Sequence, residues 1–288
     1  MKSRIIISLF FALFINSISN AQSKKKSTFP NAGQWKLGVA LYTFSNFSFP
    51  DQLANADSAG LKYIEGFSFG KAGIELKDST IMNLSPSGIE KLNTLIKKKG
   101  LIMESIYITG GKTVDKWKKD FELAKHFKVK YVTAEPQVNL WDSVDSLAGV
   151  YGIKVAIHNH WKGNSAYWHP DSLLAALKNH PNFGACPDLG HYPKSGINPV
   201  EALKKLEGRI IGIHLKDIAE YNNTKLQDVP VGTGIIDFPA VFAELTRQKF
   251  KGNINFERDT KEKPSNLVSL KQMVKYYNEA VGLSPIQK

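Results

Sequence analysis

The chain contains a single cysteine, Cys186, so no disulfide can form within it. A small secreted domain held together by disulfides is therefore excluded. Long apolar runs are also missing. The main apolar stretch, residues 5–15, is shorter than the roughly 20 residues that a membrane-spanning helix needs. We therefore expect no stable membrane anchor.

Residues 1–21 have the pattern of a secretory signal peptide. A short basic start precedes the apolar stretch, and Ser19 and Ala21 are small residues at the spacing that signal peptidase recognises. We predict cleavage after Ala21 and export to the periplasm or beyond the cell. Residues 22–34 are expected to form a flexible polar lead-in, and residues 35–288 a single catalytic domain.

The charge of the chain is strongly basic, with a formal net charge of +12 at pH 7. Much of it lies in lysine runs such as residues 24–26 and 97–99. These lysines are not interleaved with aromatic residues, and no nucleic-acid-binding motif accompanies them. We interpret them as a solvated basic surface and predict no nucleic-acid partner.

Short apolar runs recur from residue 37 onward, and each is followed by a turn and an amphipathic stretch. The runs cover residues 37–44, 61–67, 101–108, 129–135, 153–158, 183–188, 209–215 and 253–257. Strands that alternate with helices imply a parallel sheet, and this many units predict an α/β fold of the closed (β/α)8 TIM-barrel type. The main alternative, an open doubly wound sheet, requires a glycine-rich phosphate loop after the first strand. Residues 41–51 contain no glycine.

The active site of such a barrel lies where the strands end. Residues with functional side chains occupy these ends: Tyr42, Glu65, Glu104, Glu135, His158, His160, Asp188, His191, His214, Lys216 and Glu257. Imidazoles and carboxylates that converge without a second cysteine are typical of a site for one divalent metal ion, such as Mn, Co, Zn, Ni or Mg. We therefore predict a metal centre built from the late strands.

Residues 157–160 read IHNH. Because strand side chains alternate between faces, both histidines point to the same side. We predict that His158 binds the metal and that His160, further along the strand, faces the substrate as a general base, since imidazole titrates near neutral pH. Asn159 would face away in a structural role. Glu135 is the second candidate for the base.

The remaining candidates concern substrate contacts. Lys216 either donates to a substrate hydroxyl, acts as an acid, or forms a salt bridge with a neighbouring carboxylate. His191 is predicted to contact substrate or to support the metal centre. Trp161 follows the fifth strand and offers a ring against which a sugar can lie. Tyr42 and Glu65 complete the predicted substrate-binding set.

Four motifs in the second half of the chain resemble those of the xylose-isomerase-like barrel superfamily, which includes sugar epimerases, inosose dehydratases and endonuclease IV. They are CPDLGHY at 186–192, IGIHLKD at 211–217, DVPVGTGIIDF at 228–238 and NINFERD at 253–259. The resemblance implies a TIM barrel with metal ligands at His158, Asp188, His214 and Glu257.

The fifth strand departs from the epimerase pattern. Epimerases of this superfamily usually carry a glutamate there, whereas this chain has His158. The His-x-His form is similar to the inosose dehydratase branch, and in some relatives that act on oxidised glycosides the second position is a base, which here is His160. An abasic-site endonuclease is excluded, because its zinc site needs histidines on early strands and none precedes His126.

These observations favour a metal-dependent sugar isomerase or epimerase that abstracts a proton next to a carbonyl, with the metal stabilising the enediolate. A lyase or hydratase acting on 3-keto-glycosides or keto-sugars is the alternative, and a non-catalytic sugar-binding barrel is the third possibility. Export and the lack of a phosphate-binding loop predict a small-molecule partner that is an unphosphorylated sugar, keto-sugar or glycoside.

Overall fold

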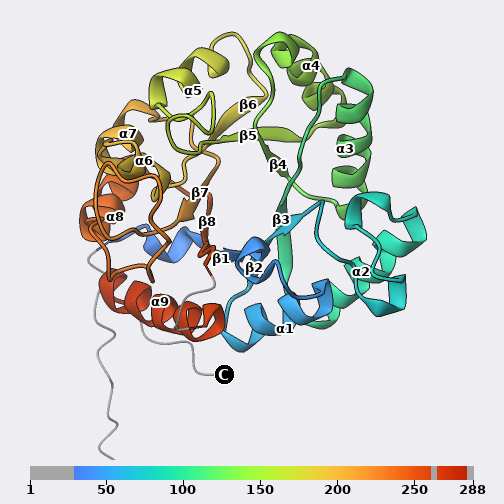
Figure 1. Ribbon diagram of the computed structural model, residues 1–288, viewed down its shortest axis with the longest axis horizontal. Coiled ribbons are helices and arrows are strands. Elements are labelled where there is room, and N and C mark those ends of the chain that lie inside the picture. Colours follow the sequence, from blue (N-terminus) through green and yellow to red (C-terminus); the bar gives the residue numbers. More distant parts are fainter. Residues whose placement is uncertain (1–28, 261–264, 284–288) are drawn as a thin grey trace, which may run out of the picture.

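The computed structural model describes residues 29–260 and 265–283. It forms a nearly closed barrel of parallel strands surrounded by helices, as Figure 1 shows in a view down the barrel. The predicted signal peptide and residues 22–28 of the predicted lead-in lie outside the described residues. The predicted (β/α)8 fold is confirmed.

The strands of the barrel follow one another around the ring. They are β1 (Lys36–Ala40), β2 (Tyr63–Phe67), β3 (Ile102–Tyr107), β4 (Tyr131–Ala134), β5 (Lys154–His158), β6 (Phe183–Cys186), β7 (Gly212–Leu215) and β8 (Asn253–Phe256). Their hydrogen-bonded order is β6-β5-β4-β3-β2-β1-β8-β7, and a parallel bridge between Ala185 and Ile210 links the two remaining edges. Seven of the eight predicted apolar runs contain their strand, and the first run overlaps β1, which begins one residue earlier at Lys36.

Helices connect the strands on the outside of the barrel. The α-helices are α1 (Phe49–Ser58), α2 (Pro86–Lys98), α3 (Val114–Phe127), α4 (Trp141–Tyr151), α5 (Pro170–Leu177), α6 (His191–Lys194), α7 (Pro199–Lys205), α8 (Phe238–Arg247) and α9 (Asn266–Val281). Short 3-10 helices are η1 (Ala32–Gln34), η2 (Leu41–Phe44), η3 (Ile74–Leu76), η4 (Ile81–Asn83) and η5 (Val138–Leu140). Among the described residues, no helix combines the length and the apolar character needed to cross a bilayer.

Helix starts follow from their capping residues. The Ser85 hydroxyl accepts a hydrogen bond from the Gly88 amide at 3.2 Å, and Asn198 accepts one from the Val200 amide at 2.8 Å. Each cap satisfies an amide that has no partner inside its helix. Proline follows both caps, where its fixed φ suits the first helical turn.

The described end of the predicted lead-in is packed rather than flexible. Phe29 is buried, and its ring lies 6.0 Å from that of Phe242 on α8. Ala32 is also buried, and the Trp35 indole donates to the Phe250 carbonyl at 3.0 Å. Residues 29–34 therefore correct the prediction of a flexible segment up to residue 34, because these apolar side chains bury surface against the barrel.

Gly38 on β1 gives a stability prediction. A Cβ at this position would lie 2.5 Å from the Tyr63 carbonyl oxygen on the neighbouring strand, which cannot move without disturbing the sheet. We expect Gly38→Ala to lower the free energy of unfolding by about 1–3 kcal/mol, the usual cost of overpacking, as measured by denaturant titration. Gly33→Ala is the matched control, because nothing lies within 4 Å of its Cβ position. Equal stability of the two variants would contradict the prediction.

Candidate active site

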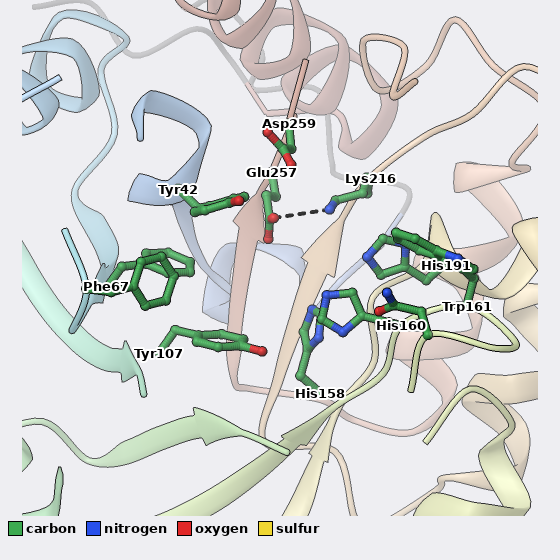
Figure 2. A pocket seen from close by; sticks show the side chains of 12 residues that line it. Tyr42, Phe67, Tyr107, His158, His160, Trp161, His191, Lys216, Glu257 and Asp259 are labelled. Atoms are coloured by element: carbon green, nitrogen blue, oxygen red, sulfur yellow. Dashed lines mark hydrogen bonds and ion pairs between the residues drawn. The ribbon is translucent and has the colours of Figure 1, made fainter. Parts of the chain in front are cut away.

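A cavity of about 270 Å³ opens at the carboxyl ends of the strands. Figure 2 shows Tyr42, Phe67 and Tyr107 on one side and His160, His191 and Trp161 on the other. The remaining lining residues are Phe69, His158, Asn164, Lys216, Glu257 and Asp259. The site therefore has an aromatic wall from the first three strands and a wall rich in nitrogen donors and acceptors from strands five to seven.

The four predicted metal ligands meet in one buried group, here called the ligand cluster: His158, Asp188, His214 and Glu257. One ligand atom from each lies within 4.8 Å of those of the others. His158 Nε2 lies 3.5 Å from Asp188 Oδ2, and His214 Nδ1 lies 2.7 Å from Glu257 Oε2. Strand ends that are up to 99 residues apart in sequence (257 minus 158) thus place their donors at one point.

The ligand cluster fits a divalent cation chemically. Within the described part of the chain, His158 Nε2, Asp188 Oδ2 and His214 Nδ1 are buried and lack a hydrogen bond of normal geometry. Buried polar atoms of this kind are costly unless something satisfies them. Burial alone would raise the pKa of Asp188 and of Glu257, yet neighbouring donors, among them Lys216, hold both pKa values well below their usual range. Two anionic carboxylates with two imidazoles are a donor set suited to such an ion.

Glu65 occupies a different place from the predicted one. It is fully buried and does not line the cavity, so the predicted contact with substrate is corrected. Its Oε1 lies 2.8 Å from His214 Nε2, while Ser105 and Thr133 donate to its Oε2 at 2.7 and 2.6 Å. A carboxylate that holds the far nitrogen of a ligand histidine fixes the ring and its tautomer.

This contact predicts the effect of changing Glu65. We expect Glu65→Gln to weaken metal affinity by about 10- to 100-fold, the usual effect of removing a carboxylate behind a ligand histidine. Chelator competition would measure the affinity. Glu75→Gln, at an exposed position outside the cavity, is the control and should leave it unchanged. An unaltered affinity in Glu65→Gln would show that Glu65 does not support the ligand cluster.

His160 and Glu135 form a pair at the edge of the cavity. His160 Nδ1 lies 2.5 Å from Glu135 Oε1, and Ser165 donates to the other carboxylate oxygen. Burial would raise the pKa of Glu135, but the neighbouring imidazoles of His158 and His160 hold this pKa well below its usual range. Among these residues His160 lines the cavity and Glu135 does not. The Glu135 carboxylate therefore holds the Nδ1 side of the His160 ring, and its role as an alternative base stays a prediction.

Asn159 has the structural position expected between the two histidines. It is fully buried, its amide donates to the Asp188 carbonyl at 3.2 Å, and its Oδ1 accepts from the Asp188 amide at 2.8 Å. This reciprocal pair ties the end of β5 to the segment after β6. The alternation of residues 157–160 thus directs the two histidines toward the site and the Asn159 side chain toward the backbone of Asp188.

Lys216 and His191 both line the cavity. Lys216 Nζ lies 3.1 Å from Glu257 Oε1 and 3.3 Å from Asp188 Oδ2, and although burial opposes it, these carboxylates raise the pKa of Lys216 well above its usual range. The lysine is therefore ion-paired and, because it lines the cavity, it can also contact a bound molecule. The His191 ring stacks on His160 at 4.9 Å, and burial holds the pKa of His191 well below its usual range.

Several site residues were not predicted from sequence. Phe67 and Tyr107 end their strands and stack at 5.3 Å, whereas the prediction took Glu65 and Glu104 as the functional residues of these two strands. Glu104 shows the opposite error. It pairs with Lys36, at the start of β1, and Lys130, just before β4, at 2.9 and 3.1 Å. These are the amino ends of the strands, so Glu104 lies away from the cavity.

Comparisons with known proteins agree with this architecture. An inosose dehydratase of Clostridium botulinum is 31% identical over 153 residues, which cover 46% of this chain and 51% of the relative. A crystal structure from Parabacteroides distasonis is 31% identical with a TM-score of 0.68, and the match covers 85% of this chain and 99% of that one. A structure of the IOLI protein with a bound zinc atom has a TM-score of 0.71 at 21% identity, over 85% of this chain and 98% of that one. The last likeness shows the fold alone.

The chain spans about half the length of the curated relatives that it matches. The family match is longer and covers residues 53–277, from α1 to α9. It includes every strand except β1 and all four residues of the ligand cluster. This chain therefore belongs to the xylose isomerase-like TIM barrel family.

Proposed function

We propose that this protein is an exported, metal-dependent sugar isomerase or epimerase that removes a proton from the carbon next to a sugar carbonyl. The observation that carries the proposal is the pair of Glu135 and His160, which lines the cavity and whose ring lies 4.8 Å from that of His158 in the ligand cluster. A base oriented by a carboxylate, beside a site for a cation, is the equipment that such a proton transfer needs.

The residues of the cavity divide the work of this reaction. With Nδ1–H donated to Glu135, the Nε2 lone pair of His160 is free to accept the substrate proton, and the carboxylate stabilises the imidazolium that forms. A divalent ion in the ligand cluster would stabilise the negative charge that develops on the carbonyl oxygen. His160 then returns the proton to the former carbonyl carbon, while the hydroxyl proton of the neighbouring carbon passes to the former carbonyl oxygen. The carbonyl group has then moved by one carbon, which is isomerisation with one base.

The walls of the cavity favour an unphosphorylated sugar. The aromatic wall offers rings for the apolar face of a sugar, while Lys216 and His191 offer polar contacts for hydroxyls. Lys216 is already paired with Glu257 and with Asp188, and the lining itself contains two acidic groups, Glu257 and Asp259. A phosphate dianion would meet this acidic surface, so the cavity suits a neutral sugar or keto-sugar better.

A lyase is the second candidate function. Lys216 is an ammonium group that lines the same cavity as His160, so it can donate a proton to a leaving hydroxyl or glycosidic oxygen after His160 has removed the proton from carbon. The similarity to inosose dehydratase and the histidine at the end of β5 favour this outcome. In this reaction the carbon–oxygen bond breaks and the product contains a new double bond.

One experiment tests the proposed function and separates the two candidates. Protein loaded separately with Mn, Co, Ni or Zn would be incubated with 3-keto-glucose in deuterated water, and the sugar followed by NMR and mass spectrometry. We expect deuterium to enter next to the carbonyl only with metal. An isomer that carries deuterium supports the isomerase, whereas loss of water with a new double bond supports the lyase. Absence of exchange with every metal would contradict both.

Export is a separate part of the proposal and rests on the pattern of residues 1–21. We expect the protein isolated from its producing cells to begin at Gln22, as N-terminal sequencing would determine. A full-length chain that begins at Met1 in the cytoplasmic fraction would contradict export and would leave the proposed chemistry untouched.

A further inference from the structure

A second cavity of about 280 Å³ adjoins the active-site cavity. The two share Trp161, His191, Lys216 and Asp259 in their linings. The other residues of this side cavity are Lys194, Thr224, Lys225, Leu226, Gln227 and Asp228. Most of them belong to the loop that follows β7, so this loop extends the site beyond the space next to the ligand cluster.

Buried charges give the side cavity a fixed structure. Lys194 and Asp228 are only 6% and 3% exposed, and Lys194 Nζ lies 3.2 Å from Asp228 Oδ1. The second oxygen of Asp228 accepts from the Asp259 amide at 3.0 Å and lies 3.6 Å from Lys216 Nζ. Lys194 also lies 5.1 Å above the Trp161 ring. Charged groups held this firmly are preorganised to bind a polar ligand.

The mixture of charges indicates which ligand fits. The lining has the ammonium groups of Lys194, Lys216 and Lys225 beside the carboxylates of Asp228 and Asp259. A phosphate would face both carboxylates, and a cation would face the lysines. Vicinal hydroxyls both donate and accept, so they can pair with groups of each sign. Trp161 lines both cavities, so its ring can contact a sugar that extends from one cavity into the other.

We propose that the side cavity is a subsite for a second hydroxyl-rich unit, so that the substrate is a glycoside or disaccharide of a keto-sugar rather than a free monosaccharide. This inference rests on the proposed function, because the reacting sugar is placed in the main cavity. The linked unit extends past Lys216 and Trp161 and hydrogen-bonds to Lys194 and Asp228. The loop after β7 then determines the size of substrate that the enzyme accepts.

Isothermal calorimetry on metal-loaded protein tests the subsite, with 3-keto-glucose and a matching 3-keto-disaccharide as probes. We expect the parent to bind the disaccharide about tenfold more tightly, as one or two added hydrogen bonds would give. Thr224→Trp should fill the side cavity and remove this difference while binding of 3-keto-glucose persists. Gln227→Trp is a second filling variant in case the first does not fold. Glu220→Trp, on the same loop but outside both linings, is the matched control and should behave like the parent.

Three results would overturn the inference. The first is equal affinity of the parent for the two sugars, and the second is a disaccharide preference that survives in both filling variants. The third is tighter binding of glucose 6-phosphate than of the disaccharide, lost on filling, which would assign the side cavity to phosphate. Deuterium exchange into both sugars is followed in parallel. Exchange that continues while the disaccharide preference is absent refutes the subsite alone, whereas absence of exchange into both sugars refutes the proposed function.

Discussion

Replacing His160 by glutamine is expected to slow deuterium exchange into a bound keto-sugar by about 10²-fold or more, the usual contribution of a positioned general base. Bound metal per chain should stay unchanged. His160 lines the cavity and is partly exposed, whereas all members of the ligand cluster are buried. Glutamine retains a hydrogen-bonding group toward Glu135 but cannot accept a proton at neutral pH. Proton abstraction should therefore slow while the metal content stays the same.

Exchange rates by NMR, together with metal content by atomic emission, would measure both parts of this result. His169→Gln is the matched control, because His169 starts α5 and does not line the cavity. His158→Ala should give the opposite pattern and weaken metal binding. Loss of metal from His160→Gln would instead favour the second group of possible ligands, Glu135, His158 and His160, as the metal site. Exchange at the parental rate would remove His160 as the base.

The barrel could be predicted from sequence because its pattern is local. Each strand is a short apolar run, and several helix starts are marked by a capping residue such as Ser85 or Asn198. The packing at the end of the lead-in could not be predicted from the sequence, since Phe29 is apolar but isolated within a polar segment. Its burial depends on Phe242, which lies more than two hundred residues away in the chain, and sequence spacing carries no record of that contact.

The candidate site could be predicted in part because alternation along a strand tells which side chains face inward. It does not tell how deep they lie. Glu65 and Glu104 illustrate the difference: one lies beneath His214, and the other lies at the amino ends of the strands. The depth of a residue depends on the stagger between neighbouring strands. The ligand cluster could be predicted because its members lie within two residues of the ends of their strands, three of them in motifs that resemble a known family.

Replacing Asp188 by alanine should reduce bound metal from about one ion per chain, as a site with four protein ligands would hold, to near zero. Asp188 is fully buried, and His158, His191 and Lys216 all approach its Oδ2 at 3.3–3.5 Å. Its removal leaves Glu257 as the sole carboxylate of the ligand cluster, so a divalent ion loses both a ligand and a charge. Deuterium exchange should disappear with the metal.

The fold should survive this change, because Lys216 retains Glu257 at 3.1 Å and no unpaired cation is left behind. Circular dichroism and thermal unfolding would verify this. Asp188→Asn is the conservative variant: its oxygen can still accept from the Gly190 amide, which Asp188 Oδ1 does at 3.0 Å, so it isolates the loss of charge. Asp171→Asn, at an exposed position on α5, is the control. A folded Asp188→Ala that keeps its metal would show that the ion binds elsewhere. A folded parent that stays metal-free after supplementation with Mn, Co, Ni and Zn would contradict the metal-dependent function itself.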